Sequence, residues 1–303
     1  VACGAPTIMM GESLMNVTNG YDTTLYREPL GVFAGIAPFN FPAMIPMGWM
    51  MPMCIATGNT LVLKAASMTP MTSMKMMKLL EEAGLPAGVV NIVTCSRKES
   101  EIFLSHPDIK GITLVGSTST GLHIYGEAAK YGKRVQCLCE AKNHALVLED
   151  APIARTAAGI INSSFGCAGE RCMALPVVVV QESIADALVE EIVKQVKTKK
   201  VGPAYEKDTD LGPVVTAEHK KFVCDWIQKG IDEGAKVVLD GRDIKVEGYE
   251  NGFYVGHTIL DHVTEEMTVG QREIFGPVLC IKRVKDFEEG LKVMNANPFA
   301  NGS

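Results

Sequence analysis

Short apolar runs alternate with helical patterns through the first half of the chain, and this alternation is the strongest constraint on its fold. Runs typical of buried strands cover 31–36, 60–64, 89–93, 111–115 and 134–138, and helical periodicity separates them at 44–56, 71–83, 99–104 and 120–130. Repeated units of strand, helix and strand predict a parallel sheet with helices on both faces. The first half is therefore predicted to be a doubly wound α/β domain.

The pattern changes near residue 140, which indicates a second domain. Further strands are expected at 145–148 and 177–181, with helices at 152–162, 184–197 and 218–233. The run 236–254 mixes glycine with charge and predicts a surface meander. Because no low-complexity linker separates the halves, we expect a continuous crossing between a domain of residues 1–140 and a domain of residues 141–303.

No charged residue occurs between Glu28 and Lys64. A charge-free stretch of this length is also typical of a membrane span. This one contains five prolines, which would break a spanning helix more than once. A buried strand, loop, helix and strand is therefore the favoured interpretation, without a membrane. The formal net charge of -6 argues against binding to a nucleic-acid backbone.

The nine cysteines are odd in number and scattered, which favours a reducing compartment over a disulfide framework. Cys172 follows Arg171 in a glycine-containing loop, where a thiol beside a guanidinium can present the thiolate that attacks carbonyls. Metal ligation by the pairs Cys137 with Cys139 and Cys167 with Cys172 is an alternative. No histidine pair at structural zinc spacing accompanies them.

Three polar candidates lie where predicted strands end or apolar runs turn. The segment Gly116–Gly121 enters a helix, so its small residues can bind a phosphate or simply cap the helix. Lys64 ends its strand and can reach a ribose or phosphate, or face solvent. Asn40 lies in an apolar stretch, where its amide either satisfies its own hydrogen bonds or donates one to an oxyanion.

Several short motifs from about Tyr26 to the end of the chain form one set. They are Pro29-Leu-Gly-Val32, Ala37-Pro-Phe-Asn-Phe-Pro42, Gly58-Asn-Thr60, Gly132-Lys-Arg-Val-Gln136, Ala141-Lys-Asn-His144, Gly169-Glu-Arg-Cys-Met-Ala174, Gly248-Tyr-Glu-Asn-Gly252 and Glu273-Ile-Phe-Gly-Pro277. Together they resemble the aldehyde dehydrogenase superfamily and, within it, the methylmalonate-semialdehyde dehydrogenase family.

The resemblance implies a fold and a set of site residues. It implies an α/β fold with a doubly wound NAD-binding domain, lacking its N-terminal part, and an α/β catalytic domain, lacking its C-terminal part. Cys172 would be the nucleophile that forms a thiohemiacetal, and Asn40 would hold the oxyanion together with the Cys172 N–H. The residues implied to bind NAD are Ala37, Phe39, Lys64, Ser117 and Glu273, with Phe275 near the nicotinamide.

The position at which most hydrolytic members of the superfamily carry a water-activating glutamate is Leu138 here. Without that base, the thiol of coenzyme A is the expected acceptor of the acyl group. The resemblance then implies oxidation of malonate or methylmalonate semialdehyde, with loss of carbon dioxide and release of acetyl-CoA or propionyl-CoA. A hydrolytic enzyme that uses water is the alternative acceptor hypothesis.

Other departures from the family motivate a second hypothesis, a diverged or truncated homologue that binds nucleotide without turnover. Glu140 replaces a family glycine near the expected nicotinamide, and Ser67 replaces an acidic residue near the adenosine. The pair Gly48-Trp49 carries one residue more than the family pattern.

Assembly and location are also implied only by resemblance. Family members are homo-oligomers that assemble through a C-terminal segment, which this sequence lacks. The small-molecule partners would be the semialdehyde and CoA. The expected location is the mitochondrial matrix in a eukaryote and the cytoplasm otherwise, and the sequence shows no targeting signal.

Overall fold

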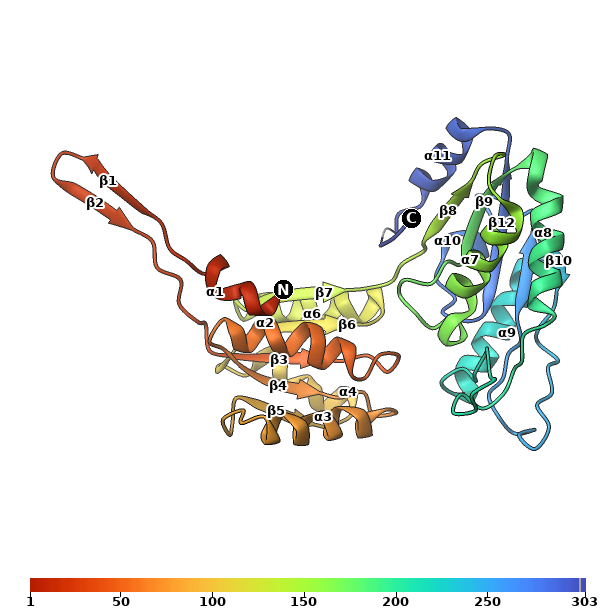
Figure 1. Ribbon diagram of the computed structural model, residues 1–303. Coiled ribbons are helices and arrows are strands. Elements are labelled where there is room, and N and C mark those ends of the chain that lie inside the picture. The colour runs from red at the N-terminus through yellow and green to blue at the C-terminus, as the bar shows by residue number, and fades with distance from the viewer. Residues whose placement is uncertain (300) are drawn as a thin grey trace. The chain divides into compact units, whose positions relative to one another are not determined.

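The computed structural model describes residues 1–299 and 301–303, and the chain divides into two units, Val1–Cys139 and Glu140–Ser303 (Figure 1). This division falls one residue before the expected boundary. Each unit has apolar cores made only of its own residues. Each unit is therefore described by itself.

The first unit contains a five-stranded sheet whose strands all run parallel. The strands occur in the order β5, β4, β3, β6, β7, with bounds Val90–Val93, Thr60–Lys64, Val32–Ile36, Ile109–Val115 and Arg134–Leu138. The chain builds outward from β3 in one direction and from β6 in the other, as the doubly wound prediction requires. The point where the order reverses lies between β3 and β6, and ligands of such sheets bind beyond the strand ends there.

Two separate cores cover the faces of this sheet. One core includes side chains of α5 (Ile102–Ser105) and α6 (Thr118–Lys130). The short helix α4 (Arg97–Ser100) comes directly before α5 in the chain. The other core contains α3 (Pro70–Glu82) and the helical segment that follows β3. Met47, Met50 and Met51 are buried in this second core, where the unbranched methionine side chain fills irregular space.

The helix expected at 44–56 begins as a π-helix, η2 (Met44–Met50), and continues as α2 (Met51–Ala56). The Met51 N–H donates to the carbonyl of Pro46, five residues back. Pro52 has no N–H to donate and its ring crowds the turn before it, which the wider π turn relieves. Gly48 and Trp49 are exposed within this turn. The π turn therefore places both residues at the surface.

The charge-free stretch is thus the expected buried unit of strand, loop, helix and strand. In the residues that the structure describes, no helix is both long enough and apolar enough to cross a membrane.

The N-terminal elements were not predicted from the sequence. They are η1 (Ala2–Gly4), α1 (Ala5–Ile8) and a hairpin of β1 (Ser13–Thr18) and β2 (Tyr21–Thr24), which extends away from the sheet of its unit (Figure 1). Every residue of both hairpin strands is exposed. With neither face buried, these strands lack the apolar and polar alternation by which a strand is recognised.

The second unit is a five-stranded sheet in the order β10, β11, β12, β9, β8, in which only the β10–β11 pair is antiparallel. The strand bounds are Lys236–Leu239, Thr258–Asp261, Val278–Val284, Val177–Gln181 and His144–Val147. The helices are α7 (Ile153–Phe165), α8 (Glu182–Val196), α9 (Ala217–Asp232), α10 (Thr268–Gln271) and α11 (Phe287–Ala296). The elements from β11 onward were not predicted.

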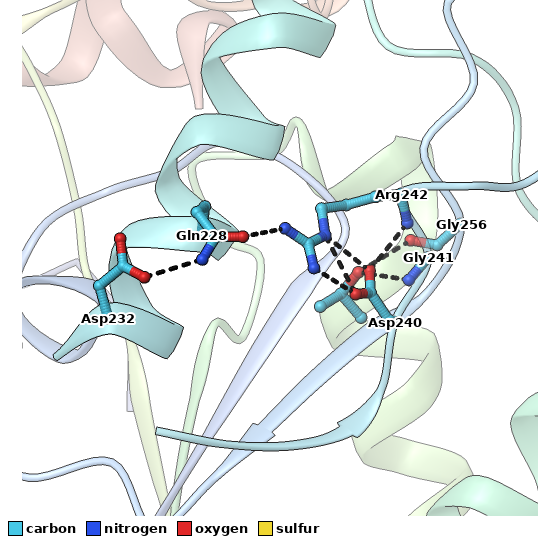
Figure 2. Close-up of polar contacts among 7 residues, drawn as sticks. Gln228, Asp232, Asp240, Gly241, Arg242 and Gly256 are labelled. Carbon is cyan, nitrogen blue, oxygen red and sulfur yellow. Dashed lines mark hydrogen bonds and ion pairs between the residues drawn. The ribbon is translucent and has the colours of Figure 1, made fainter. Parts of the chain in front are cut away.

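The expected meander at 236–254 begins as the edge strand β10. The residues after this strand are held by hydrogen bonds and an ion pair. Figure 2 shows the Arg242 guanidinium between the Asp240 carboxylate, at 2.9 Å, and the side-chain oxygen of Gln228 on α9, at 2.7 Å. The Gly256 N–H donates to the Gly241 carbonyl at 2.8 Å. These contacts hold both ends of the segment against the unit.

Candidate active site

The loop that carries Cys172 begins at η3 (Gly166–Gly169), directly after α7. Cys167, Ala168 and Gly169 have φ angles of 53°, 55° and 71°, so three consecutive residues are left-handed and two of them are not glycine. Such conformations are costly for residues with a side chain and are often found at functional sites. A methyl group at Gly169 would lie 2.2 Å from the Gly276 carbonyl oxygen. The loop therefore packs tightly against the segment 273–277.

Side-chain amides fix the backbone at Cys172. The buried Asn143 donates from Nδ2 to the carbonyl of Cys172 at 2.9 Å and to that of Ala174 at 2.6 Å. Asn301 donates to the Cys172 carbonyl as well, at 3.1 Å. Within the described part of the chain, the Cys172 N–H donates to no recorded acceptor. The carbonyl is thus held while the N–H remains available to a ligand.

Arg171 holds the loop to the helix before it. Its Nη2 donates to the carbonyls of Asn162 and Ser163, at 2.7 and 2.9 Å, near the C-terminal end of α7. Helix ends carry carbonyls without intrahelical partners, and a cation there is stabilising. The sequence suggested that this guanidinium activates the neighbouring thiol. The structure instead shows it serving as a helix cap.

Cys172 shares a narrow pocket with Glu273, Phe275, Asn143 and Ala141. The Glu273 carboxylate accepts a hydrogen bond from the Ala141 N–H at 3.3 Å. Burial, with a smaller contribution from the charge of Glu140, raises the pKa of Glu273 to about 7. The structure therefore brings together three of the predicted site residues, Cys172, Glu273 and Phe275.

Two buried basic residues lie beside Asn143 in the sequence. The Lys142 side chain is 1% exposed, and burial lowers its pKa. Its Nζ has no hydrogen-bond partner among the residues that the structure describes. His144 donates from Nδ1 to the Lys142 carbonyl at 2.7 Å, and burial lowers its pKa to about 4. His144 is therefore neutral near pH 7, which agrees with its lack of a charged partner.

The other predicted site residues belong to the first unit. Ala37, Phe39 and Asn40 follow β3, and Lys64 ends β4, where its carbonyl accepts from the Ala37 N–H at 3.0 Å. Ser117 follows β6 and caps α6, accepting from the Thr120 N–H at 3.4 Å. All five lie at the carboxyl edge of the sheet, around the reversal point between β3 and β6.

Glu170 and His219 were missed by sequence reasoning. The buried Glu170 carboxylate accepts from the Val215 N–H at 3.0 Å, and burial raises its pKa to about 7. His219, from α9, approaches both Glu170 and the Phe275 carbonyl. Glu170 could have been noticed as the neighbour of Arg171 and Cys172, but nothing in the sequence marks His219.

All nine cysteines are free thiols. In the described ranges, no group of three or more His, Cys, Asp or Glu side chains is arranged to hold a metal ion. The metal-ligand interpretation of the cysteine pairs therefore gains nothing from the structure.

The family model described as "Aldehyde dehydrogenase family" matches residues 1–303. The chain belongs to the aldehyde dehydrogenase family. Among curated relatives within this family, malonate-semialdehyde dehydrogenase 1 of Oceanobacillus iheyensis is 46% identical over 303 residues, and malonate-semialdehyde dehydrogenase 2 of Bacillus mycoides is 47% identical over 302 residues. Each alignment covers 100% of this chain and 62% of the relative.

Solved aldehyde dehydrogenase structures agree in fold. A methylmalonate-semialdehyde dehydrogenase from Oceanimonas doudoroffii is 43% identical with a TM-score of 0.95, over 99% of this chain and 62% of that one. A putative methylmalonate-semialdehyde dehydrogenase from Sinorhizobium meliloti, complexed with NAD, is 41% identical with a TM-score of 0.96, over 99% and 61%. The resemblance and the fold inferred from the sequence are therefore confirmed.

This aldehyde dehydrogenase chain spans about 62% of the length of the curated relatives it matches. These relatives come from bacteria, so they lend no support to a mitochondrial location.

Proposed function

We propose that this protein is an NAD-dependent, CoA-acylating dehydrogenase of malonate or methylmalonate semialdehyde. The observation that carries the proposal is the Cys172 loop, in which a thiol lies beside an available backbone N–H in a strained and tightly packed turn. The names of the relatives, malonate-semialdehyde and methylmalonate-semialdehyde dehydrogenase, support the substrate class.

In the proposed reaction the Cys172 thiolate adds to the aldehyde carbon, and the carbonyl oxygen becomes an oxyanion. The Cys172 N–H and the Asn40 amide donate to that oxyanion, which is where catalytic hydrogen bonds have their greatest effect. NAD, when bound, accepts hydride from the former aldehyde carbon, which leaves a thioester on Cys172.

The residues present fit a bound dinucleotide. In doubly wound sheets such ligands bind at the reversal point, and Ala37, Phe39, Lys64 and Ser117 surround it. Within the described residues the half-buried Lys64 ammonium has no ion-pair partner, so it is available to a ribose or phosphate. Glu273, with a carboxylate partly shielded from water, is proposed as a further ribose contact.

Coenzyme A is the proposed acyl acceptor because Leu138 cannot activate water. Leu138 ends β7, and its side chain is 44% exposed. The CoA thiol would attack the thioester, releasing the acyl-CoA and regenerating the Cys172 thiol. The C–C bond to the substrate's carboxylate would break to release carbon dioxide, and the enolate carbon that remains would take up a proton, so that acetyl-CoA or propionyl-CoA is the product.

The test is NADH formation from methylmalonate semialdehyde, with and without CoA. We expect Cys172→Ala to reduce the rate on the order of a thousandfold or more, because no other group can form the thioester. Cys167→Ala, which changes an exposed thiol on the same loop, is the matched control and should keep most of the activity. Undiminished NADH formation by Cys172→Ala would refute the proposal, and full product formation without CoA would favour the hydrolytic alternative.

Glu140 supports a second candidate, a homologue that binds nucleotide with little turnover. Its charge raises the pKa of Glu273, so the two carboxylates lie close enough to influence each other. Calorimetric titration with NAD separates the two candidates. Clear binding without NADH formation would favour the second, and restored turnover in Glu140→Gly would identify the cause.

Location and assembly are proposed from the relatives and from the exposed hairpin. Bacterial relatives support a cytoplasmic location. The exposed β1–β2 hairpin, which carries Leu14, Met15, Val17 and Tyr21 on its surface, is compatible with the homo-oligomers implied by resemblance.

A further inference from the structure

Two loops meet beside Cys172, and one histidine touches both. The first loop, 166–172, carries the thiol, and the second, 273–277, carries Glu273 and Phe275. His219 Nε2 lies 2.7 Å from the Phe275 carbonyl oxygen and 3.5 Å from Glu170 Oε1. Because a carbonyl oxygen only accepts hydrogen bonds, Nε2 must carry a proton and donate it. The imidazole thus joins the second loop to the residue two positions before Cys172.

The second loop needs such a restraint. Phe275 has a φ of 58°, in the left-handed region that residues with a side chain rarely adopt. A strained conformation of this kind persists only when its surroundings over-determine it. The next residue, Gly276, packs closely against α9, since a methyl group there would lie 2.6 Å from a methyl carbon of Val223.

The histidine itself is held rigidly. Its backbone N–H donates to the Thr216 hydroxyl at the start of α9, at 3.0 Å. Its ring stacks on Phe222 with centroids 5.7 Å apart and planes 17° from parallel, and only 19% of its side chain is exposed. Glu170 is fixed by the Val215 N–H, from the segment that leads into the same helix. The start of α9 therefore provides contacts to both loops.

We propose that His219 is a positioning residue. Together with Glu170 it holds the Phe275 carbonyl, and it thereby sets the distance between Cys172 and the loop 273–277, on which Phe275 would lie near the nicotinamide. The effect of His219 on catalysis rests on the proposed function. Its contacts with the two loops do not depend on that function. His219 touches neither thiol nor substrate in this role and acts through the two loops.

The experiment compares His219→Ala with His219→Gln, because a glutamine amide nitrogen can take the place of Nε2 and donate to the same carbonyl. Glu218→Gln, an exposed neighbour on α9, is the matched control. Three quantities are measured in each protein. They are hydrogen exchange in peptides covering 166–174 and 273–278, the rate of Cys172 alkylation by iodoacetamide, and the KM for NAD beside kcat.

We expect His219→Ala to accelerate exchange in the 273–278 peptide about tenfold, as the loss of one buried hydrogen bond allows. The Cys172 alkylation rate should change several-fold, and the KM for NAD should rise about tenfold with a smaller change in kcat. His219→Gln should restore most of each quantity, and Glu218→Gln should leave all three unchanged. If His219→Ala does not fold, His219→Asn, whose amide is too short to reach, replaces it.

Two results would overturn the inference. One is unchanged exchange and alkylation in His219→Ala, and the other is failure of glutamine to restore what alanine loses, which would indicate packing alone. If no protein forms NADH, the proposed function fails. The exchange and alkylation measurements still decide the role of His219, because neither requires turnover.

Discussion

Individual residues near Cys172 differ in how well their polar groups are satisfied. Asn143 makes hydrogen bonds to two carbonyls of the Cys172 loop and accepts one from the Gly302 N–H at 2.8 Å. Lys142, its neighbour, is also buried, but within the described part of the chain its Nζ has no hydrogen-bond partner. Burial raises the pKa of Glu170 and Glu273, and lowers that of Lys142 and His144. Each of these groups favours its neutral form, which costs less to bury.

Glu170 should make stability fall with rising pH. Its pKa is about 7 when folded and near 4.5 in an unfolded chain, so the folded state binds more protons between these values. Stability must then decrease as pH rises through that window, by up to about 3 kcal/mol from this group. We expect Glu170→Gln to remove this part of the pH dependence of the free energy of unfolding. Urea unfolding of both proteins at pH 5 and pH 8 checks it, and an equal pH dependence in the two would contradict it.

Replacing Lys142 should not weaken the fold. An amine without a hydrogen-bond partner loses its solvation on burial, whereas methionine of similar length does not. We expect Lys142→Met to raise the free energy of unfolding by about 1 to 3 kcal/mol, measured by urea denaturation. Lys282→Met is the matched control. Lys282 is also buried but pairs with Glu265 at 2.5 Å, so its loss should destabilise. A less stable Lys142→Met protein would show that the amine has a partner after all.

At the scale of elements, the segment between β3 and β4 shows how a wide helical turn is placed without disturbing the sheet. The π-helix η2 holds buried side chains at Ile45, Met47 and Met50, while Gly48 and Trp49 face solvent. One wider turn keeps the flanking strands in register, since β3 and β4 remain paired from Val32 with Thr60 to Ile36 with Lys64. The carboxyl edge of the sheet is therefore undisturbed by the π turn at Gly48 and Trp49.

Deletion of Gly48 should be tolerated for the same reason. The remaining residues can form an ordinary α-helical turn, and the deleted glycine is exposed and a poor helix former. We expect the free energy of unfolding to change by less than about 1 kcal/mol. Deletion of Gly126 from the regular helix α6 is the control and should cost more, because that helix has no wide turn to absorb the shift. Equal losses in the two proteins would refute this account of η2.

For the molecule as a whole, the division into two units follows from where apolar side chains are buried. The core of the second unit uses residues from both sides of its sheet, including Val177, Val178, Val179 and Val180 of β9, all fully buried. Strand β9 lies between β8 and β12 and is therefore covered along both edges as well. A unit with its own core can in principle fold alone.

Residues 140–303, prepared alone, should unfold cooperatively in urea. The core of this unit contains no residue from before position 140. Far-ultraviolet circular dichroism and tryptophan fluorescence of Trp226 should report the same midpoint. Residues 149–303, which lack strand β8, are the control and should lose stability because one edge of β9 becomes unpaired. Non-coincident transitions in the longer fragment would show that the unit depends on the rest of the chain.

The sequence by itself determined the doubly wound sheet, because strands buried on both faces are continuous apolar runs and the helices between them have a clear period. It also predicted Cys172, Asn40 and the cofactor candidates, because these lie in short motifs of contiguous residues. Their roles remain predictions. Only the tertiary structure revealed the cap formed by Arg171, the orphaned amine of Lys142 and the bridge formed by His219. These three features depend on contacts that exist only once α7, α9 and the two loops have packed together. Local sequence patterns do not predict such contacts.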